Sequence, residues 1–261
     1  MNQFVKDQDE FENVNFYIHQ ALEIGFNGSI GAPVHEKLQT GAKVLEFGCT
    51  SGVWSTEVAA EYPNSKFYAI DSTMQSSTDK NVTFIGCDIY QKLPFPDNEF
   101  DYVFSRNKTD LFSKNNFQGF LFEIIRVLKP EGWLEIVHSL RTDDYSGQAS
   151  ARLDAAIISW HNERGVDFDI IKNLEDYFKM SGKLEFISSQ IIKIPIGGDN
   201  FGEFSYEVAL YYIKLMKELL APFMGISSEE YDRLSKEIED EMKQKRGELH
   251  GKQKRVFARK K

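Results

Sequence analysis

Apolar residues recur every three or four positions in several stretches of the chain, which is the spacing of an amphipathic helix. These stretches are 9–24, 53–62, 115–128, 150–164, 170–180 and 203–220. Ser227 and Glu230 have the spacing of a capping box and precede a charged helix that we expect to run to about Arg246. Glycines at 25–31 end the first helix in a loop.

Short runs rich in β-branched and aromatic residues lie between the predicted helices and indicate strands. They are 44–47, 66–70, 82–86, 101–105, 133–139, 184–194 and 255–259. Strands that alternate with helices are typical of right-handed βαβ units and of a parallel sheet covered on both faces. The pattern predicts an α/β protein, and no repeat, low-complexity linker or clear domain boundary interrupts it.

Composition narrows the class of protein. The chain has 261 residues, 41% hydrophobic and 27% charged, which suffices for a packed core without disulfide or metal staples. No stretch approaches the roughly 20 apolar residues of a membrane span, and the first residues are too polar for a signal peptide. Cys49 and Cys87 suit a reducing compartment. We therefore expect a cytoplasmic, globular protein.

Charge is distributed unevenly along the chain. Residues 243–261 hold nine Lys or Arg and one acid, a net +8 that leaves −17 on the rest of a chain whose total is −9. A basic tail can indicate nucleic-acid binding. Here it contains the alternating strand pattern of 255–259, and the acidic body would repel a phosphate backbone. We do not expect a nucleic-acid partner, and the pattern does not indicate an oligomeric state.

Glycines and carboxylates follow the predicted strands at the edge where a parallel sheet binds its ligands. Gly48 and Gly52 lie after the first strand, where glycine lets a backbone approach a ligand and the next helix offers free N–H groups. Asp71 follows the second strand in a place suited to ribose hydroxyls, and Asp88 follows the third. Each feature alone is as often a plain turn or a helix cap. Their order along the chain favours a binding site.

The chain resembles the class I S-adenosylmethionine (SAM)-dependent methyltransferases over residues 40–140. The run AKVLEFGCTSGVW is similar to their first motif, FYAIDST to the second, and GCDIYQKLPFPDNEFDYVFSR to the third and fourth. FLFEIIRVLKPEGWLEIVH resembles the helix and fifth strand that follow. The most similar subgroup is the small-molecule type related to ubiquinone-biosynthesis methyltransferases, especially fungal members, which GFNGSIGAPV and SSEEYDRL also resemble.

The resemblance implies a Rossmann-like, doubly wound, mostly parallel seven-stranded sheet with an antiparallel last strand. It also implies an N-terminal helix and loop over 1–40 that cap the site, and a SAM-binding domain over 41–261. A helical insertion at about 197–247, before the last strand, would serve as a lid. Aromatic residues dense in that insertion, such as Phe204 and Tyr212, are either core or a cover over an apolar or aromatic acceptor.

The resemblance also assigns roles to single residues. Gly48 and Gly52 would line the methionine part of SAM, and Glu46 would orient the loop or meet the ammonium group. Asp71 would bind the ribose diol, and Asp88 would accept the adenine amino group. Further cofactor contacts would come from Cys49, Trp54, Ser72, Ile89 and Arg106, the last of which would also face the acceptor chamber.

The implied reaction moves a methyl group from SAM to a small, apolar or aromatic acceptor by in-line displacement and releases S-adenosylhomocysteine (SAH). Holding the reacting atoms about 3–3.5 Å apart and aligned supplies much of the catalysis. A base is needed only if the acceptor must lose a proton. His138, near the end of the fifth strand, is then the candidate, although it could equally be a hydrogen-bonded strand-end histidine.

The sequence departs from the family where Thr50 replaces a glycine and where Ser72 stands in place of a larger apolar residue. A threonine with positive φ would cost about 1–2 kcal/mol. The alternative of a degenerate SAM-binding or regulatory protein without turnover therefore stays open.

Other classes fit less well. A dehydrogenase fingerprint would read G-x-G-x-x-G, but this chain has Thr50 and Val53 at two of its glycine positions. Enzymes that methylate amino groups of DNA bases carry Asn/Asp-Pro-Pro-aromatic after the fourth strand, where this chain has 105–108, SRNK. The histidines are scattered without ligand spacing, so we expect no metal.

Overall fold

The computed structural model describes the whole chain except residues 1–7, 90, 109–111, 142–145 and 168–169. The chain forms two compact units. We call the first the helical unit, made of Met1–Gly25, Leu140–Val166 and Ile192–Lys252. We call the second the sheet unit, made of Phe26–Ser139, Asp167–Ile191 and Gln253–Lys261. Among the described residues, no helix has the length and apolar character needed to cross a bilayer.

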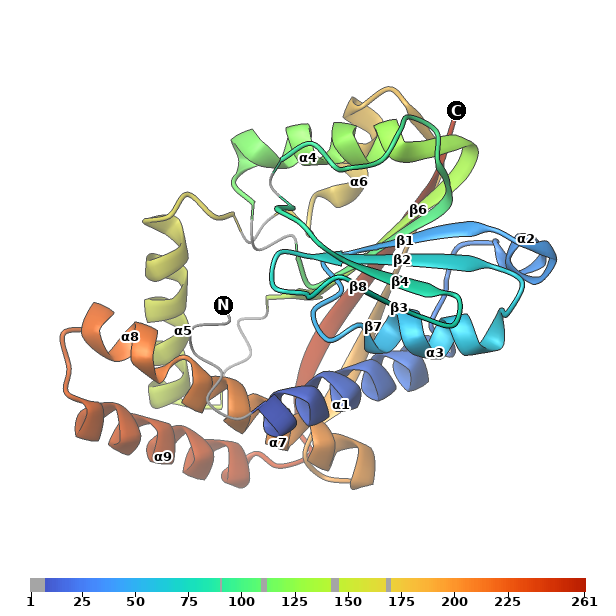
Figure 1. Cartoon of the computed structure of the whole chain (residues 1–261). Helices are drawn as coiled ribbons and strands as arrows, with labels where there is room; N and C mark the ends of the chain where they lie inside the picture. The colour runs from blue at the N-terminus through green and yellow to red at the C-terminus, as the bar shows by residue number, and fades with distance from the viewer. Residues whose placement is uncertain (1–7, 90, 109–111, 142–145, 168–169) are drawn as a thin grey trace. The chain divides into compact units, whose positions relative to one another are not determined.

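The strands form one eight-stranded sheet in the order β3-β4-β2-β1-β5-β6-β8-β7 (Figure 1). Their bounds are β1 Lys43–Phe47, β2 Lys66–Asp71, β3 Ser77–Asp79, β4 Val82–Gly86, β5 Phe100–Arg106, β6 Leu128–Leu140, β7 Leu184–Ile196 and β8 Leu249–Lys260. β1 pairs in parallel with β2 and β5, as do β2 with β4 and β5 with β6. The predicted doubly wound α/β sheet is confirmed.

The two ends of β7 lie beside opposite ends of β8. Lys261 N donates to Lys183 O at 3.0 Å, next to the start of β7. At the far end, a Cβ built on Gly198 would lie 2.8 Å from the Cα of Gly247, just before β8. The last strand is therefore antiparallel to β7, as the sequence resemblance implied.

Four helices belong to the sheet unit: α2 His35–Thr40, α3 Val53–Glu61, α4 Lys114–Val127 and α6 Leu174–Met180. The helical unit contains essentially all of α1 Gln8–Phe26, with α5 Gln148–Asn162, α7 Asn200–Leu215, α8 Lys217–Phe223 and α9 Ser228–Gln244. The capping box predicted before α9 is present, because the Ser227 hydroxyl accepts from Glu230 N while the Glu230 carboxylate accepts from Ser227 N. Leu220, Tyr231 and Leu234 are core residues of this unit.

Five details differ from the prediction. The sheet has an eighth strand, β3, which runs antiparallel to β4. The short helix α2 was not expected. The helix predicted over 203–220 is two helices that meet near Met216. The helix predicted over 170–180 begins only at Leu174. β6 begins at Leu128 rather than at 133, because Phe100 pairs with Leu128 and a register shift brings Tyr102 opposite Trp133.

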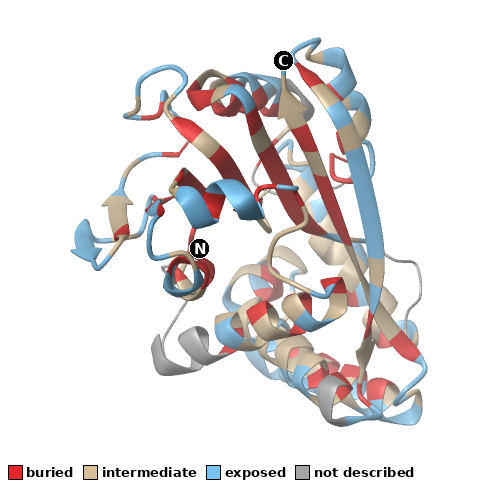
Figure 2. Ribbon diagram, turned by 90° about the vertical axis from the view of Figure 1, so that its right-hand side faces the viewer, coloured by how far each residue is buried: buried red, intermediate tan, exposed pale blue. Residues whose placement is uncertain are grey.

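Burial follows the order of the sheet. The central strands are lined with buried residues, whereas the edge strand β7 is exposed along most of its middle (Figure 2). Val44, Leu45 and Phe47 of β1 are all fully buried. A packed centre of this kind holds the ends of β1, β2 and β5 rigidly, and these are the ends that carry the candidate site.

Candidate functional site

A glycine turn joins β1 to α3 and ties three elements together. Gly48 N and Cys49 N both donate to Ile70 O, at 2.8 and 3.0 Å, so that the turn is fixed to the end of β2. Gly52 precedes the first residue of α3, and its N–H donates to Cys49 O at 2.8 Å. The turn therefore holds its shape through backbone hydrogen bonds.

Both glycines of the turn are required by backbone conformation and by space. Gly48 has φ 71° and Gly52 has φ 75°, in the left-handed region. A Cβ on Gly52 would lie 2.4 Å from the Phe84 ring, and one on Gly48 would lie 2.5 Å from Cγ of Lys108. A larger residue at either position would strain the backbone and collide with a neighbouring side chain.

Thr50 lies between these glycines with φ 54°, the left-handed conformation that the family glycine would take. This conformation is unfavourable for a β-branched residue. Thr50 N donates to Oδ2 of Asp71 at 3.1 Å, which helps to hold the strained residue in place. The strain expected for a positive φ at this position is therefore present.

Asp71, the last residue of β2, is 4% exposed and accepts several hydrogen bonds. Besides Thr50 N, the donors are Thr73 N at 3.1 Å and Thr73 Oγ1 at 2.8 Å, both to Oδ1. Lys108 Nζ lies 3.4 Å from Oδ2. Burial opposes ionisation, but the charge of Lys108 and the bonds from Thr73 and Thr50 outweigh it and lower the pKa of Asp71. The carboxylate is therefore ionised at neutral pH.

Lys108 is a site residue that sequence reasoning missed. It follows β5, and its side chain is 12% exposed and extends across the glycine turn. The prediction singled out Arg106 at the end of the same strand. Arg106 pairs in register with Val137 of β6, and its charge acts on Glu46. The sequence did offer a signal for Lys108. It is a second cation only two residues after Arg106, the last residue of β5, and so lies at the same ligand-binding end of the sheet.

Glu46 lies on β1 and is 2% exposed. Its Oε2 accepts from Ser55 N at 3.2 Å, which links β1 to the first turn of α3. Burial raises the pKa of Glu46 to about 7, although Arg106 and Ser55 act in the opposite direction. Glu46 thus changes charge near neutrality, directly beneath the glycine turn.

The other predicted cofactor contacts of this strand edge differ in exposure. Asp88 is exposed and accepts from Gln91 Nε2 at 2.9 Å, whereas Ile89 beside it is buried. Ser72 is exposed beside Asp71. Cys49 is buried, and burial raises the pKa of its thiol, as do the charges of Glu46 and Asp71, so the thiol is not ionised at neutral pH.

Trp54 is 1% exposed and lies in the core behind the turn. Its ring stacks on Phe104 with centroids 4.0 Å apart, and its Nε1 donates to Ser29 O at 3.2 Å. Trp54 thereby links the start of α3 to the glycine loop that follows α1.

The same loop is fixed by a buried carboxylate that sequence reasoning did not identify. Glu135 of β6 has no exposed surface and accepts from Gly31 N at 2.9 Å, Ala32 N at 2.8 Å and Tyr102 Oη at 2.9 Å. Arg255 of β8 pairs with Glu135 at 2.9 Å and donates to Gly28 O at 2.8 Å. We call Glu135 and Arg255 with these partners the Glu135 cluster.

His138 lies near the carboxyl end of β6, beside the end of β5 that carries Arg106. It follows Val137, the register partner of Arg106, and is 7% exposed. Its Nδ1 lies 3.0 Å from Ser139 O.

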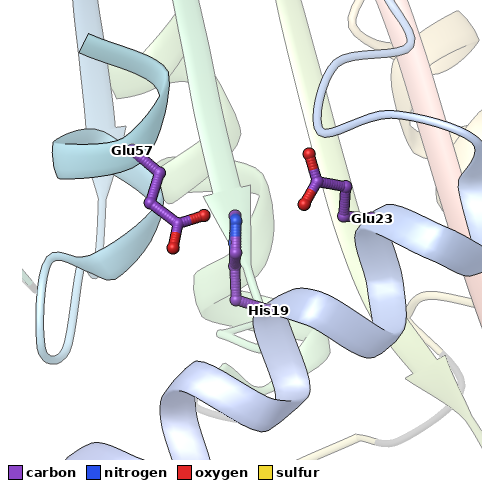
Figure 3. A group of neighbouring side chains, drawn as sticks. All are labelled: His19, Glu23 and Glu57. Carbon is purple, nitrogen blue, oxygen red and sulfur yellow. The ribbon is translucent and has the colours of Figure 1, made fainter. Parts of the chain in front are cut away.

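Three further side chains with atoms that could ligate a metal are drawn in Figure 3. His19 and Glu23 stand one turn apart on α1 of the helical unit, whereas Glu57 is on α3 of the sheet unit. Neither unit by itself holds the three, and we assign no metal site to them.

A family model described as a methyltransferase domain matches residues 44–132. The methyltransferase str3 of Strobilurus tenacellus is 26% identical over 59% of this chain and 57% of its own length. The fatty-acid O-methyltransferase of Mycolicibacterium smegmatis is 26% identical over 52% of this chain and 50% of its own length. The chain thus spans about half the length of these curated relatives.

A solved structure shows the same fold. Phosphoethanolamine N-methyltransferase 2 of Haemonchus contortus, in complex with phosphomonomethylethanolamine and SAH, superposes with a TM-score of 0.52. It is 19% identical, and the match covers 92% of this chain and 56% of that chain. The matched segment, 44–132, contains the glycine turn, Asp71, Asp88 and Lys108. Over residues 44–132, which hold the candidate site, this chain is similar to methyltransferases.

Proposed function

We propose that this protein transfers the methyl group of SAM to a small, apolar or aromatic acceptor by in-line displacement. The observation that carries the proposal is Asp71, a buried and ionised carboxylate at the end of β2, hydrogen-bonded to the glycine turn. An ionised acceptor held in a largely buried place binds hydroxyl donors more strongly than the same group in water.

The residues around Asp71 fit a nucleoside cofactor. Gly48 and Gly52 would hold the methionine part, since only glycine fits their conformation and space. Glu46 would support this turn or meet the cofactor's ammonium group. Asp71 would accept from the ribose hydroxyls, and Asp88 would accept from the adenine amino group.

The remaining predicted contacts have less specific roles. Ile89 and Ser72 would flank the adenosine part, with Ile89 supplying apolar surface. Cys49 and Trp54 would support the turn from within the core, because both are buried.

When bound, SAM supplies a methyl group that is already activated for displacement. The chain's own residues hold the reactants in line and exclude water, which lowers the barrier without covalent chemistry. Arg106 and His138 share one strand edge, so we place the acceptor on that side of the cofactor. His138 would take a proton only from an acceptor that must lose one.

An apolar acceptor is supported by two observations. The Mycolicibacterium relative is named for methylation of a fatty acid. In the helical unit, the Tyr17 and Phe204 rings stack with centroids 5.0 Å apart, and Phe204 is 47% exposed. Such aromatic surface suits an apolar ligand.

The proposal is tested by turnover. The purified protein is incubated with SAM and a panel of fatty acids, sterols and phenols, and SAH formation is measured for wild type and for Asp71→Asn. We expect wild type to form SAH with at least one acceptor class and the variant to form at least about tenfold less at limiting SAM. SAM binding without turnover on any acceptor would contradict the proposal and favour the non-catalytic alternative.

A further inference from the structure

The side chain of Lys108 lies across the part of the site where the proposed cofactor would bind. Its Cγ, Cδ and Cε are the three atoms nearest to a Cβ built on Gly48, at 2.5–2.8 Å. The methylene stem therefore covers the face of Gly48 on which a side chain would stand. A cofactor cannot approach the turn at Gly48 from this side unless the stem moves.

The ammonium group of the same lysine faces Asp71. Nζ lies 3.4 Å from Oδ2, and the two side chains are only 12% and 6% exposed, so that salt screens the pair little. The other carboxylate oxygen, Oδ1, already accepts both hydrogen bonds from Thr73. Oδ2 accepts from Thr50 N and pairs with Lys108. Lys108 therefore occupies the direction in which a ligand hydroxyl would approach Oδ2.

We infer that Lys108 is a displaceable latch on the cofactor site: its ammonium competes with the ribose hydroxyls for Asp71, while its stem covers Gly48. This inference rests on the proposed function, since it concerns the entry of SAM or SAH into that site. A long, unbranched lysine can withdraw by rotation about its own side-chain bonds and leaves the backbone in place. The affinity for cofactor is then reduced by the fraction of molecules in which the latch is closed.

The test is calorimetric titration of SAH into wild type and two variants. Lys108→Met keeps a stem of similar length and removes the charge, whereas Lys108→Ala removes both. SAH is the probe because its sulfur is uncharged, so the change of charge at position 108 does not act on a sulfonium. Lys129→Met is the matched control, since Lys129 pairs with Asp101 at 2.9 Å in the same unit.

We expect Lys108→Met to bind SAH about tenfold more tightly than wild type, and Lys108→Ala at least as tightly as Lys108→Met. Lys129→Met should bind as wild type does. If wild type binds SAH and both position-108 variants bind equally or more weakly, the latch is wrong while the cofactor site stands. If none of the four proteins binds SAH, the proposed function fails and the latch fails with it.

Discussion

Two buried carboxylates among the described residues of the sheet unit, Glu135 and Asp71, each pair with a cation, and the two pairs differ in how far they are shielded from solvent. Glu135 has no exposed surface, three hydrogen-bond donors and an arginine at 2.9 Å. Asp71 is slightly exposed and faces a lysine at the longer distance of 3.4 Å. Arginine is always charged and rigid in its donor geometry, whereas lysine is a point charge on a flexible stem.

The Glu135 pair is a fixed part of the framework, whereas the Asp71 pair can exchange its cation for a ligand. Every partner of Glu135 is part of the framework: the loop at Gly31 and Ala32, β5 at Tyr102 and β8 at Arg255. At Asp71 backbone N–H groups and Thr73 hold the carboxylate, and Lys108 can leave by rotation of its long side chain without moving the backbone. Asp71 therefore has a partner that a ligand can replace.

The largest effect should come from breaking the fixed pair. Arg255→Met leaves Glu135 buried without its cation, which costs about 3–5 kcal/mol of the free energy of unfolding. The measurement is urea denaturation at neutral pH. The control is Arg259→Met, since the Arg259–Glu185 pair at 2.6 Å is about one-third exposed and should contribute less than about 1 kcal/mol. Equal losses of unfolding free energy in Arg255→Met and Arg259→Met would contradict the claim that the buried Glu135 pair is a fixed support.

Glu46, a third buried carboxylate of the sheet unit, should make the free energy of unfolding depend on pH. Its pKa of about 7 in the folded protein lies above the ordinary 4.5, so the folded state holds a proton that the unfolded state releases between these values. The free energy of unfolding attributable to Glu46 should therefore fall by up to about 3 kcal/mol as the pH rises through this window.

Glu46→Gln removes this titration. Its stability relative to wild type, measured by urea denaturation, should rise between about pH 5 and about pH 8. A constant difference between the two proteins would show that the pKa of Glu46 is not raised.

The smallest effect concerns the strained residue beside Asp71. Thr50→Gly relieves a positive φ of 54° and should raise the free energy of unfolding by about 0.5–1 kcal/mol, after the entropy cost of glycine. Ser51→Gly is the control, because its φ is not positive and the substitution should destabilise. Thermal unfolding of both variants measures the sign, and a loss at position 50 would overturn the strain argument.

The prediction from sequence succeeded where apolar periodicity is strong. The core strands β1, β2 and β5 were found because their runs are mostly apolar, and the helix α4 because its apolar stripe is long. The strand β3 was missed because its three residues, Ser-Thr-Asp, are all exposed and it depends on pairing with β4. The helix α2 is only six residues long and buries a single leucine.

For the site, too, the sequence predicted the features that a local pattern marks and missed those that depend on distant contacts. Glycines and acids at strand ends could be predicted from their order, and the structure brings Gly48, Thr50 and Asp71 together. Lys108 and the Glu135–Arg255 pair could not, since each depends on contacts between residues 37 to 120 positions apart and no local pattern marks them. The capping role of 1–40 and the lid role of 197–247 stay predictions.

The most direct measurement is SAH binding by calorimetry to wild type, Asp71→Asn and Asp101→Asn. Asp101 lies at the opposite end of β5 from Arg106 and accepts from Lys43 N at 2.8 Å, so it controls for the loss of a structural carboxylate. We expect wild type and Asp101→Asn to bind SAH, and Asp71→Asn to bind it about 100-fold more weakly, because the substitution removes charged hydrogen bonds to the ribose. Equal binding by all three proteins would contradict the assignment of the cofactor site to Asp71.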